Sequence, residues 1–110
     1  MNFKRGDIVI AVLSGDYGKP RPCIVVQSDI YPHLQSLTFC PLTSALRDDV
    51  PLLRINIGPT PENGLREESQ VAVDKIATVP KVRVAQIIGR ASDEVMSQVT
   101  SALAVFLEVG

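Results

Sequence analysis

The sequence has no tryptophan, a single histidine and only two cysteines among its 110 residues. One histidine and two separated cysteines do not supply the ligand set of a zinc site, so we expect no metal and no other cofactor. Cys23 and Cys40 both lie in apolar stretches. This favours unpaired, buried thiols in a reducing, cytoplasmic setting over a disulfide.

Long apolar runs are also missing. No stretch approaches the roughly 20 apolar residues that span a bilayer, and the N-terminal MNFKRGD has no apolar segment behind its charges. We therefore predict neither a membrane segment nor a signal peptide. The net charge of −1 argues against a broad surface for non-specific nucleic-acid binding, but it leaves room for a local basic groove. Without a linker or repeat, the chain is expected to form a single domain over residues 1–110.

Short apolar runs, separated by glycine and proline, occupy most of the chain. They predict strands at residues 7–13, 21–28, 36–44, 51–57 and 69–76, and a strand or short helix at residues 82–89. The first run is apolar almost without interruption, which is typical of a strand covered on both faces.

The apolar period changes near the C-terminus. Over residues 92–108, apolar side chains recur at helical spacing at Val95, Val99, Ala102, Leu103 and Phe106. Ser92 is suited to cap the helix N-terminus, and acidic residues follow it in the first turn. The sequence therefore predicts a mainly β fold, a small antiparallel barrel or curled sheet, closed by one long C-terminal helix.

Arg21 stands between Pro20 and Pro22, at the mouth of the second predicted strand. Each proline fixes its own φ and favours extended geometry in the residue before it. The backbone around Arg21 therefore has little freedom, which suits a guanidinium that must be held still. The alternative is a surface arginine whose aliphatic stem packs on the sheet.

Five segments, in this order, resemble the MazF/PemK family of type II toxins: RGDIVIAVL, KPRPCIVVQSD, CPLTSA, GLREESQVAVDKIATV and IIGRASDEVMSQVTSALAVFLEVG. The resemblance covers nearly the whole chain and implies an SH3-like or CcdB-like β-barrel with a C-terminal helix. It also implies a toxin that cleaves single-stranded RNA, mainly mRNA, as a sequence-selective, metal-independent endoribonuclease (an mRNA interferase). The implied partners are a second copy in a homodimer and a cognate antitoxin with an acidic, partly disordered segment.

The resemblance also assigns roles to individual residues. Metal-free cleavage uses attack of the 2′-OH on its own phosphate, with charge stabilisation by Arg21. Thr43 matches a strand-end threonine that donates to a phosphate oxygen or orients Arg21, unless the Thr43–Ser44 pair merely satisfies a turn. Asp74 matches a later aspartate that accepts a proton or positions a base; a simple salt bridge is the alternative.

Three further residues complete the predicted site. Tyr17 and Lys19 place an aromatic ring beside a cation, which suits base stacking and phosphate attraction, although an ordinary turn would look the same. Ser44 is the third predicted RNA-binding residue. His33, the single histidine, matches no catalytic position of the family, and we interpret it as an exposed loop residue.

Two departures from the family leave the RNA motif and the proton-transfer scheme open. The loop at residues 14–20 is short and lacks the Glu and Gln of many members, and Ala72 stands where some members have arginine. Two other functions are weighed against the nuclease. A CcdB-like DNA gyrase poison shares the fold, but its ending depends on a tryptophan that this chain lacks. A catalytically inactive RNA-binding relative is the third candidate.

Overall fold

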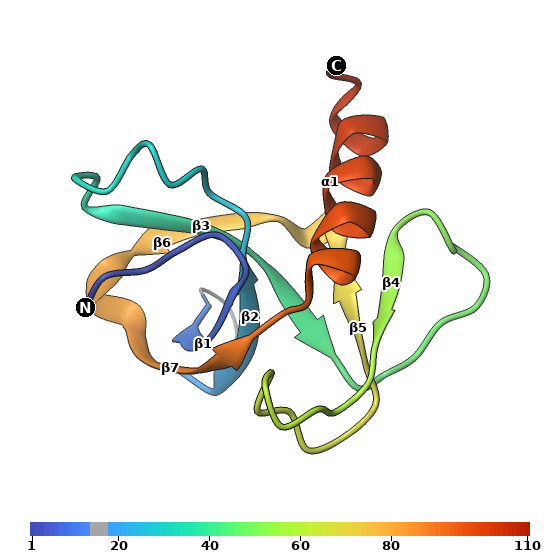
Figure 1. Cartoon of the computed structure of the whole chain (residues 1–110), viewed down its shortest axis with the longest axis horizontal. Coiled ribbons are helices and arrows are strands. Elements are labelled where there is room, and N and C mark those ends of the chain that lie inside the picture. Colours follow the sequence, from blue (N-terminus) through green and yellow to red (C-terminus); the bar gives the residue numbers. More distant parts are fainter. Residues whose placement is uncertain (14–17) are drawn as a thin grey trace.

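The computed structural model, which describes residues 1–13 and 18–110, contains a curled antiparallel sheet with one long helix packed on it (Figure 1). The strands are β1 (Asp7–Val12), β2 (Pro20–Val25), β3 (Ser36–Thr43), β4 (Arg54–Ile57), β5 (Ser69–Ala72), β6 (Ala77–Pro80) and β7 (Val84–Arg90). Two 3₁₀ turns, η1 (Val73–Lys75) and η2 (Lys81–Arg83), precede β6 and β7, and the helix α1 (Asp93–Leu107) follows.

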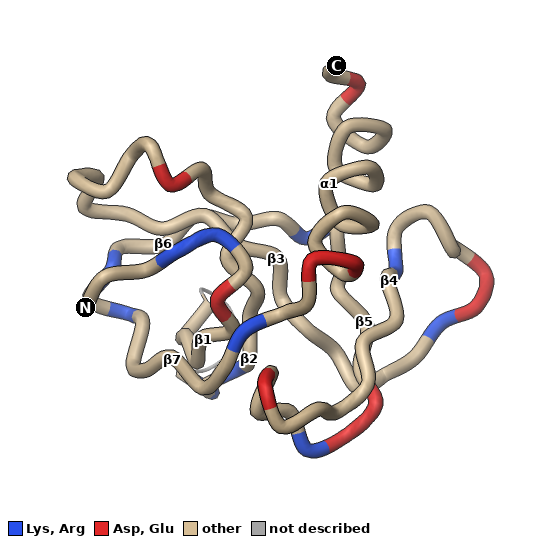
Figure 2. Tube along the Cα trace, viewed as in Figure 1, with Lys and Arg blue, Asp and Glu red and all other residues tan. Residues whose placement is uncertain are grey.

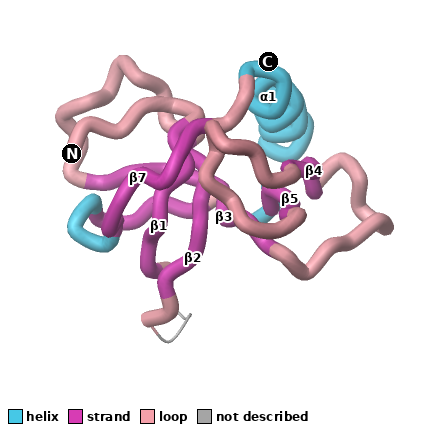
Figure 3. Tube along the Cα trace, turned by 60° about the horizontal axis from the view of Figure 1, so that its bottom comes forward, coloured by secondary structure: helices cyan, strands magenta, loops and turns pink. Residues whose placement is uncertain are grey.

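The strands are hydrogen-bonded in the order β4-β5-β3-β2-β1-β7, and β6 also pairs with β3. Figure 3 shows β7, β1, β2 and β3 side by side, with α1 beside β4 and β5. Over the described part of the chain no ladder joins β4 to β7, so the sheet curls without closing. The predicted mainly β fold with a long C-terminal helix is confirmed, with a curled sheet in place of a closed barrel.

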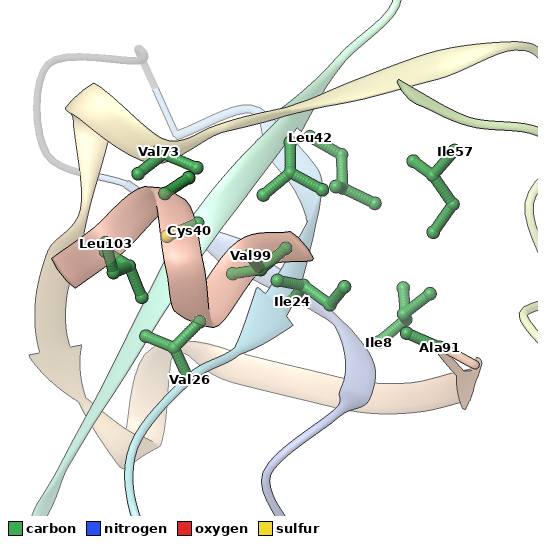
Figure 4. Close-up of a cluster of buried hydrophobic side chains, with 12 residues drawn as sticks. Ile8, Ile24, Val26, Cys40, Leu42, Ile57, Val73, Ala91, Val99 and Leu103 are labelled. Atoms are coloured by element: carbon green, nitrogen blue, oxygen red, sulfur yellow. The ribbon is translucent and has the colours of Figure 1, made fainter. Parts of the chain in front are cut away.

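The strand β1, which lies between β2 and β7, is buried on both faces, as its nearly unbroken apolar sequence predicts. Ile8 packs in a cluster beneath α1, whereas Val9 and Ala11 belong to a second cluster enclosed by the curl of the sheet. Figure 4 shows how Val99 of α1 reaches into the first cluster. The second cluster surrounds Phe39, which is fully buried. Alternate side chains of one strand therefore fill two cores.

The helix α1 begins where its sequence predicts. The Ser92 hydroxyl accepts a hydrogen bond from the Val95 amide at 3.2 Å, and Glu108 ends the helix in the left-handed region at φ 56°. Val99 is buried, whereas Val105 is 64% exposed, so only one face of the helix is covered in the single chain. In the described part of the chain, no helix combines the length and apolar content that crossing a membrane requires.

The two cysteines are buried and form no disulfide, as predicted. They come from adjacent strands but belong to different clusters, Cys40 beneath α1 and Cys23 within the curl. Burial raises the pKa of the Cys40 thiol to about 12, because the apolar core disfavours its ionised form.

Two segments differ from the sequence-based assignment. The strand predicted at residues 69–76 ends at Ala72 and continues as η1, and the strand β6, which was not predicted, pairs with β3. The pairing of β6 with β3 joins positions far apart in sequence, with Leu37 opposite Val79, so no local sequence pattern predicts it. Residues 82–89 form the end of η2 and most of β7, so the strand alternative is right for most of that segment.

Candidate active site

Arg21 lies on β2 at a point where the strand has only one neighbour. It stands opposite Ala11 of β1, whereas the pairing of β2 with β3 begins two residues later, at Cys23. Pro22 therefore faces no β3 ladder, as a residue without an amide hydrogen requires. The half-buried Arg21 lines two cavities, of about 640 Å³ and about 420 Å³.

The larger cavity, here called the basic cavity, has four cationic residues in its wall. They are Arg21, Arg47, Arg54 and Lys75. Among the described residues that line it, none is acidic. Elsewhere, Lys and Arg are dispersed along the trace rather than gathered on one element (Figure 2). The near-neutral chain therefore concentrates positive charge locally, in a space whose size fits a ligand such as a nucleotide.

The smaller cavity, here called the second cavity, lies on the other side of Arg21. Its apolar wall includes Ile10, Pro22, Leu65 and Ile88, and its polar residues are Ser44, Arg66, Glu67, Ser69 and Gln86. An apolar wall with a few polar groups is typical of a site for a flat organic group such as a nucleobase. Arg21 thus stands between a cationic space and a largely neutral one.

Thr43 ends β3 and lines the basic cavity together with Arg21. Its hydroxyl accepts a hydrogen bond from the Ala45 amide at 3.0 Å, so the predicted turn role is present. An accepting hydroxyl keeps its own hydrogen, which remains able to donate to an anion in the cavity. The next residue, Ser44, lines the second cavity. The structure therefore brings Arg21, Thr43 and Ser44 to one place.

Asp74 lies in η1, where it forms an ion pair with Arg54. Its carboxylate is 28% exposed, and it does not itself line the basic cavity, although Ala72 and Lys75 on either side do. The salt-bridge alternative for Asp74 is therefore realised, with Arg54 as the cation.

Sequence reasoning missed Arg54. It lies on β4 directly opposite Ala72 of β5, and its side chain is only 5% exposed. Its Nε is buried and has no hydrogen-bond partner within the described residues. The available signal was an arginine inside the short apolar strand predicted at residues 51–57, since a buried charge needs a partner or a ligand.

The remaining predicted residues are Lys19, Tyr17 and His33. Lys19 is exposed just ahead of β2 and lines neither cavity, and Tyr17 lies outside the described residues. His33 is exposed in a turn, as expected.

Hydrogen bonding from Arg47 lowers the pKa of the exposed Asp49 carboxyl. In residues 1–13 and 18–110, no three His, Cys, Asp or Glu side chains gather as a metal site would require.

Known proteins share both the sequence pattern and the fold. A family model described as the PemK-like, MazF-like toxin of type II toxin–antitoxin systems matches residues 4–107. The chain is 41% identical over 108 residues to the probable endoribonuclease MazF of Mycolicibacterium smegmatis. That match covers 97% of this chain and 98% of the relative.

Solved structures agree on the fold. The toxin MazF-mt6 of Mycobacterium tuberculosis is 24% identical with a TM-score of 0.79, over 94% of this chain and 98% of that one. A mycobacterial endoribonuclease in complex with its cognate antitoxin is 21% identical with a TM-score of 0.81, over 98% and 97%. A MazE–MazF structure from Deinococcus radiodurans is 20% identical with a TM-score of 0.80, over 100% and 99%. At these identities the structures establish the fold alone.

Proposed function

The chain belongs to the PemK-like, MazF-like toxins of type II toxin–antitoxin systems, and we propose that it is an endoribonuclease that cleaves single-stranded RNA at selected sequences without a metal. The observation that carries the proposal is the position of Arg21 between the basic cavity and the second cavity. A backbone phosphate binds at Arg21, and the RNA on its two sides occupies the two cavities.

The reaction is attack of a ribose 2′-OH on the neighbouring phosphorus. The 2′-OH loses its proton as the new P–O2′ bond forms, and the O5′ oxygen takes up a proton as the P–O5′ bond breaks, which leaves a 2′,3′-cyclic phosphate and a 5′-hydroxyl. Arg21 stabilises the charge that develops on the phosphorane, because its planar fork reaches two phosphate oxygens. Thr43 donates its hydroxyl hydrogen to a phosphate oxygen or orients Arg21, while the Ala45 amide holds its oxygen. The predicted acceptor role of Asp74 competes with its ion pair to Arg54.

Selectivity for a sequence arises in the second cavity. Its apolar wall accepts the face of an unstacked base, and polar residues that line it, such as Ser44 and Gln86, contact the base edge. Lys19, which lines neither cavity, and Tyr17, two residues before it in sequence, remain predicted contacts to the RNA.

The proposed partners are a second copy of the chain and an antitoxin. An acidic, partly disordered antitoxin segment would complement the basic cavity and block the RNA path. The exposed apolar end of α1, including Val105 and Phe106, supports a homodimer. Light scattering should give about twice the 11.9 kDa chain mass, and a mass that stays at 11.9 kDa at all concentrations would contradict the dimer.

The decisive experiment incubates the purified protein with a long single-stranded RNA in EDTA and maps the new ends. We expect discrete cuts with 5′-hydroxyl ends, loss of cutting in Arg21→Ala, and resistance of a substrate with 2′-deoxyribose at the cut site. Arg83→Ala is the control, since Arg83 is exposed in η2 and lines neither cavity. Intact RNA with stalled gyrase would support a gyrase poison instead, and RNA that is bound but uncut would support an inactive relative.

A further inference from the structure

The guanidinium of Arg54 is buried in the wall of the basic cavity, with an incomplete set of partners. A guanidinium carries five N–H donors. Within the described residues Arg54 has one acceptor, a carboxylate oxygen of Asp74, and its buried Nε has none. An arginine that served only to hold β4 in place would be expected to have its donors satisfied by protein groups.

The surroundings of Arg54 favour an anion as the missing partner. Arg21, Arg47 and Lys75 line the same cavity, and the described lining contains no carboxylate. Arg47 has Asp49 as its own counterion, at 2.8 Å. Asp74 does not line the cavity, so it offsets the charge of Arg54 without occupying the space that a ligand would fill.

We propose that Arg54 is a second phosphate-binding residue of the basic cavity, and that Asp74 acts through Arg54 as a positioning residue. The inference rests on the proposed function and names the contact for the phosphate next to the one that is cut. RNA carries one phosphate per nucleotide, so a strand with one phosphate at Arg21 brings the next into the cavity that both arginines line. The ion pair fixes the orientation of the guanidinium, which pre-organises the contact.

The first test is the salt dependence of RNA binding. The probe is a single-stranded RNA with 2′-deoxyribose at the cut site, which binds without being cleaved. Arg54→Gln should weaken binding about tenfold and reduce the slope of log affinity against log salt by about 0.7, the value for one phosphate contact to a single strand. Arg90→Gln is the control, because Arg90 also forms an ion pair, with Asp7 at 3.0 Å, but is 54% exposed and lines neither cavity. An unchanged slope in Arg54→Gln would overturn the inference.

The second test is a double-mutant cycle on the cleavage rate with Asp74→Asn and Arg54→Gln. If Asp74 acts through Arg54, Asp74→Asn slows cleavage at low RNA concentration mainly through KM and has no further effect when Arg54 is already replaced. If Asp74 is instead the general base, Asp74→Asn lowers kcat about 100-fold or more in both backgrounds, which overturns its positioning role. Should Arg54→Gln fail to fold, the kcat of Asp74→Asn alone still decides between the two roles.

The two proposals fail in different ways. RNA left intact by the wild-type protein contradicts the nuclease, while binding of the uncleavable RNA still reports on Arg54. Cleavage that is lost in Arg21→Ala, combined with an unchanged salt slope in Arg54→Gln, contradicts this inference alone.

Discussion

A single methyl group at position 89 tests how closely the loop of residues 58–64 packs on β7. An ideal Cβ at Gly89 would lie 2.3 Å from the Asn63 carbonyl carbon and 2.4 Å from its oxygen. It would also lie 2.6 Å from the carbonyl oxygen of Glu62, which accepts a hydrogen bond from the Arg90 amide at 2.8 Å. The obstacle is therefore backbone that the sheet itself holds in place.

The size of the effect follows from these distances. Ordinary van der Waals contact begins near 3.4 Å, so Gly89→Ala forces the loop and β7 apart by about 1 Å. The side chain of Asn63 is buried and bonds to Gly58, Thr60 and Leu65, which resists the shift. We expect a loss of about 3 kcal/mol, the upper part of the range for overpacking, and a drop in Tm of about 13 °C.

The same displacement should reach the active site. Gly64, Leu65 and Ile88 of β7 all line the second cavity, and Gly64 packs directly against Ile88, since a Cβ at Gly64 would lie 2.3 Å from the Ile88 carbonyl oxygen. A shift of about 1 Å in a substrate-positioning wall can slow a reaction by about 100-fold. The rate of RNA cleavage in Gly89→Ala, measured well below its Tm, should therefore fall while the protein remains folded.

The assay is thermal unfolding followed by circular dichroism, with Gly58→Ala as the matched control. A Cβ at Gly58 would meet only the carboxylate end of Glu68, at 2.9 Å and 3.1 Å, and that flexible side chain can rotate away. The control should therefore lose less than about 2 °C. If the Tm of Gly89→Ala lies within about 2 °C of the Tm of Gly58→Ala, the loop and β7 do not approach each other as closely as these distances require.

Three further predictions concern the core and the helix. Because burial raises the pKa of Cys40 to about 12, its thiol should stay protonated at about pH 8 and resist iodoacetamide in the native protein but react after unfolding. Alkylated Cys40 detected by mass spectrometry in the native protein would contradict this. Ser92→Ala should remove the cap on Val95 and cost about 1 kcal/mol by thermal unfolding, whereas Ser97→Ala, exposed within the helix, should cost less; equal losses would deny the cap any role. Val99→Ala should destabilise by about 2 kcal/mol in urea, and Val105→Ala on the exposed face by under about 0.5; the reverse order would refute the assigned packing face.

Most of the fold was predictable because its signals are local. The apolar run of β1 predicted a strand buried on both faces, and the helical spacing after Ser92 predicted α1 together with the residue at which it begins. Apolar residues that recur every two or every 3.6 positions can be recognised within a short segment, without knowledge of the rest of the chain. The strand β6 was not predicted because its four residues are stabilised by pairing with β3, some forty positions away in sequence.

The sequence by itself determined that Arg21 would be held between two rings at the start of a strand, since proline restricts the backbone without help from tertiary contacts. Only the tertiary structure decided what Arg21 faces, because its two cavities are built from strands and loops spread over most of the chain. The partner of Asp74 was settled in the same way. Pairing of β4 with β5 sets Arg54 opposite Ala72, two residues before Asp74, and strand register is a non-local property that no short segment encodes.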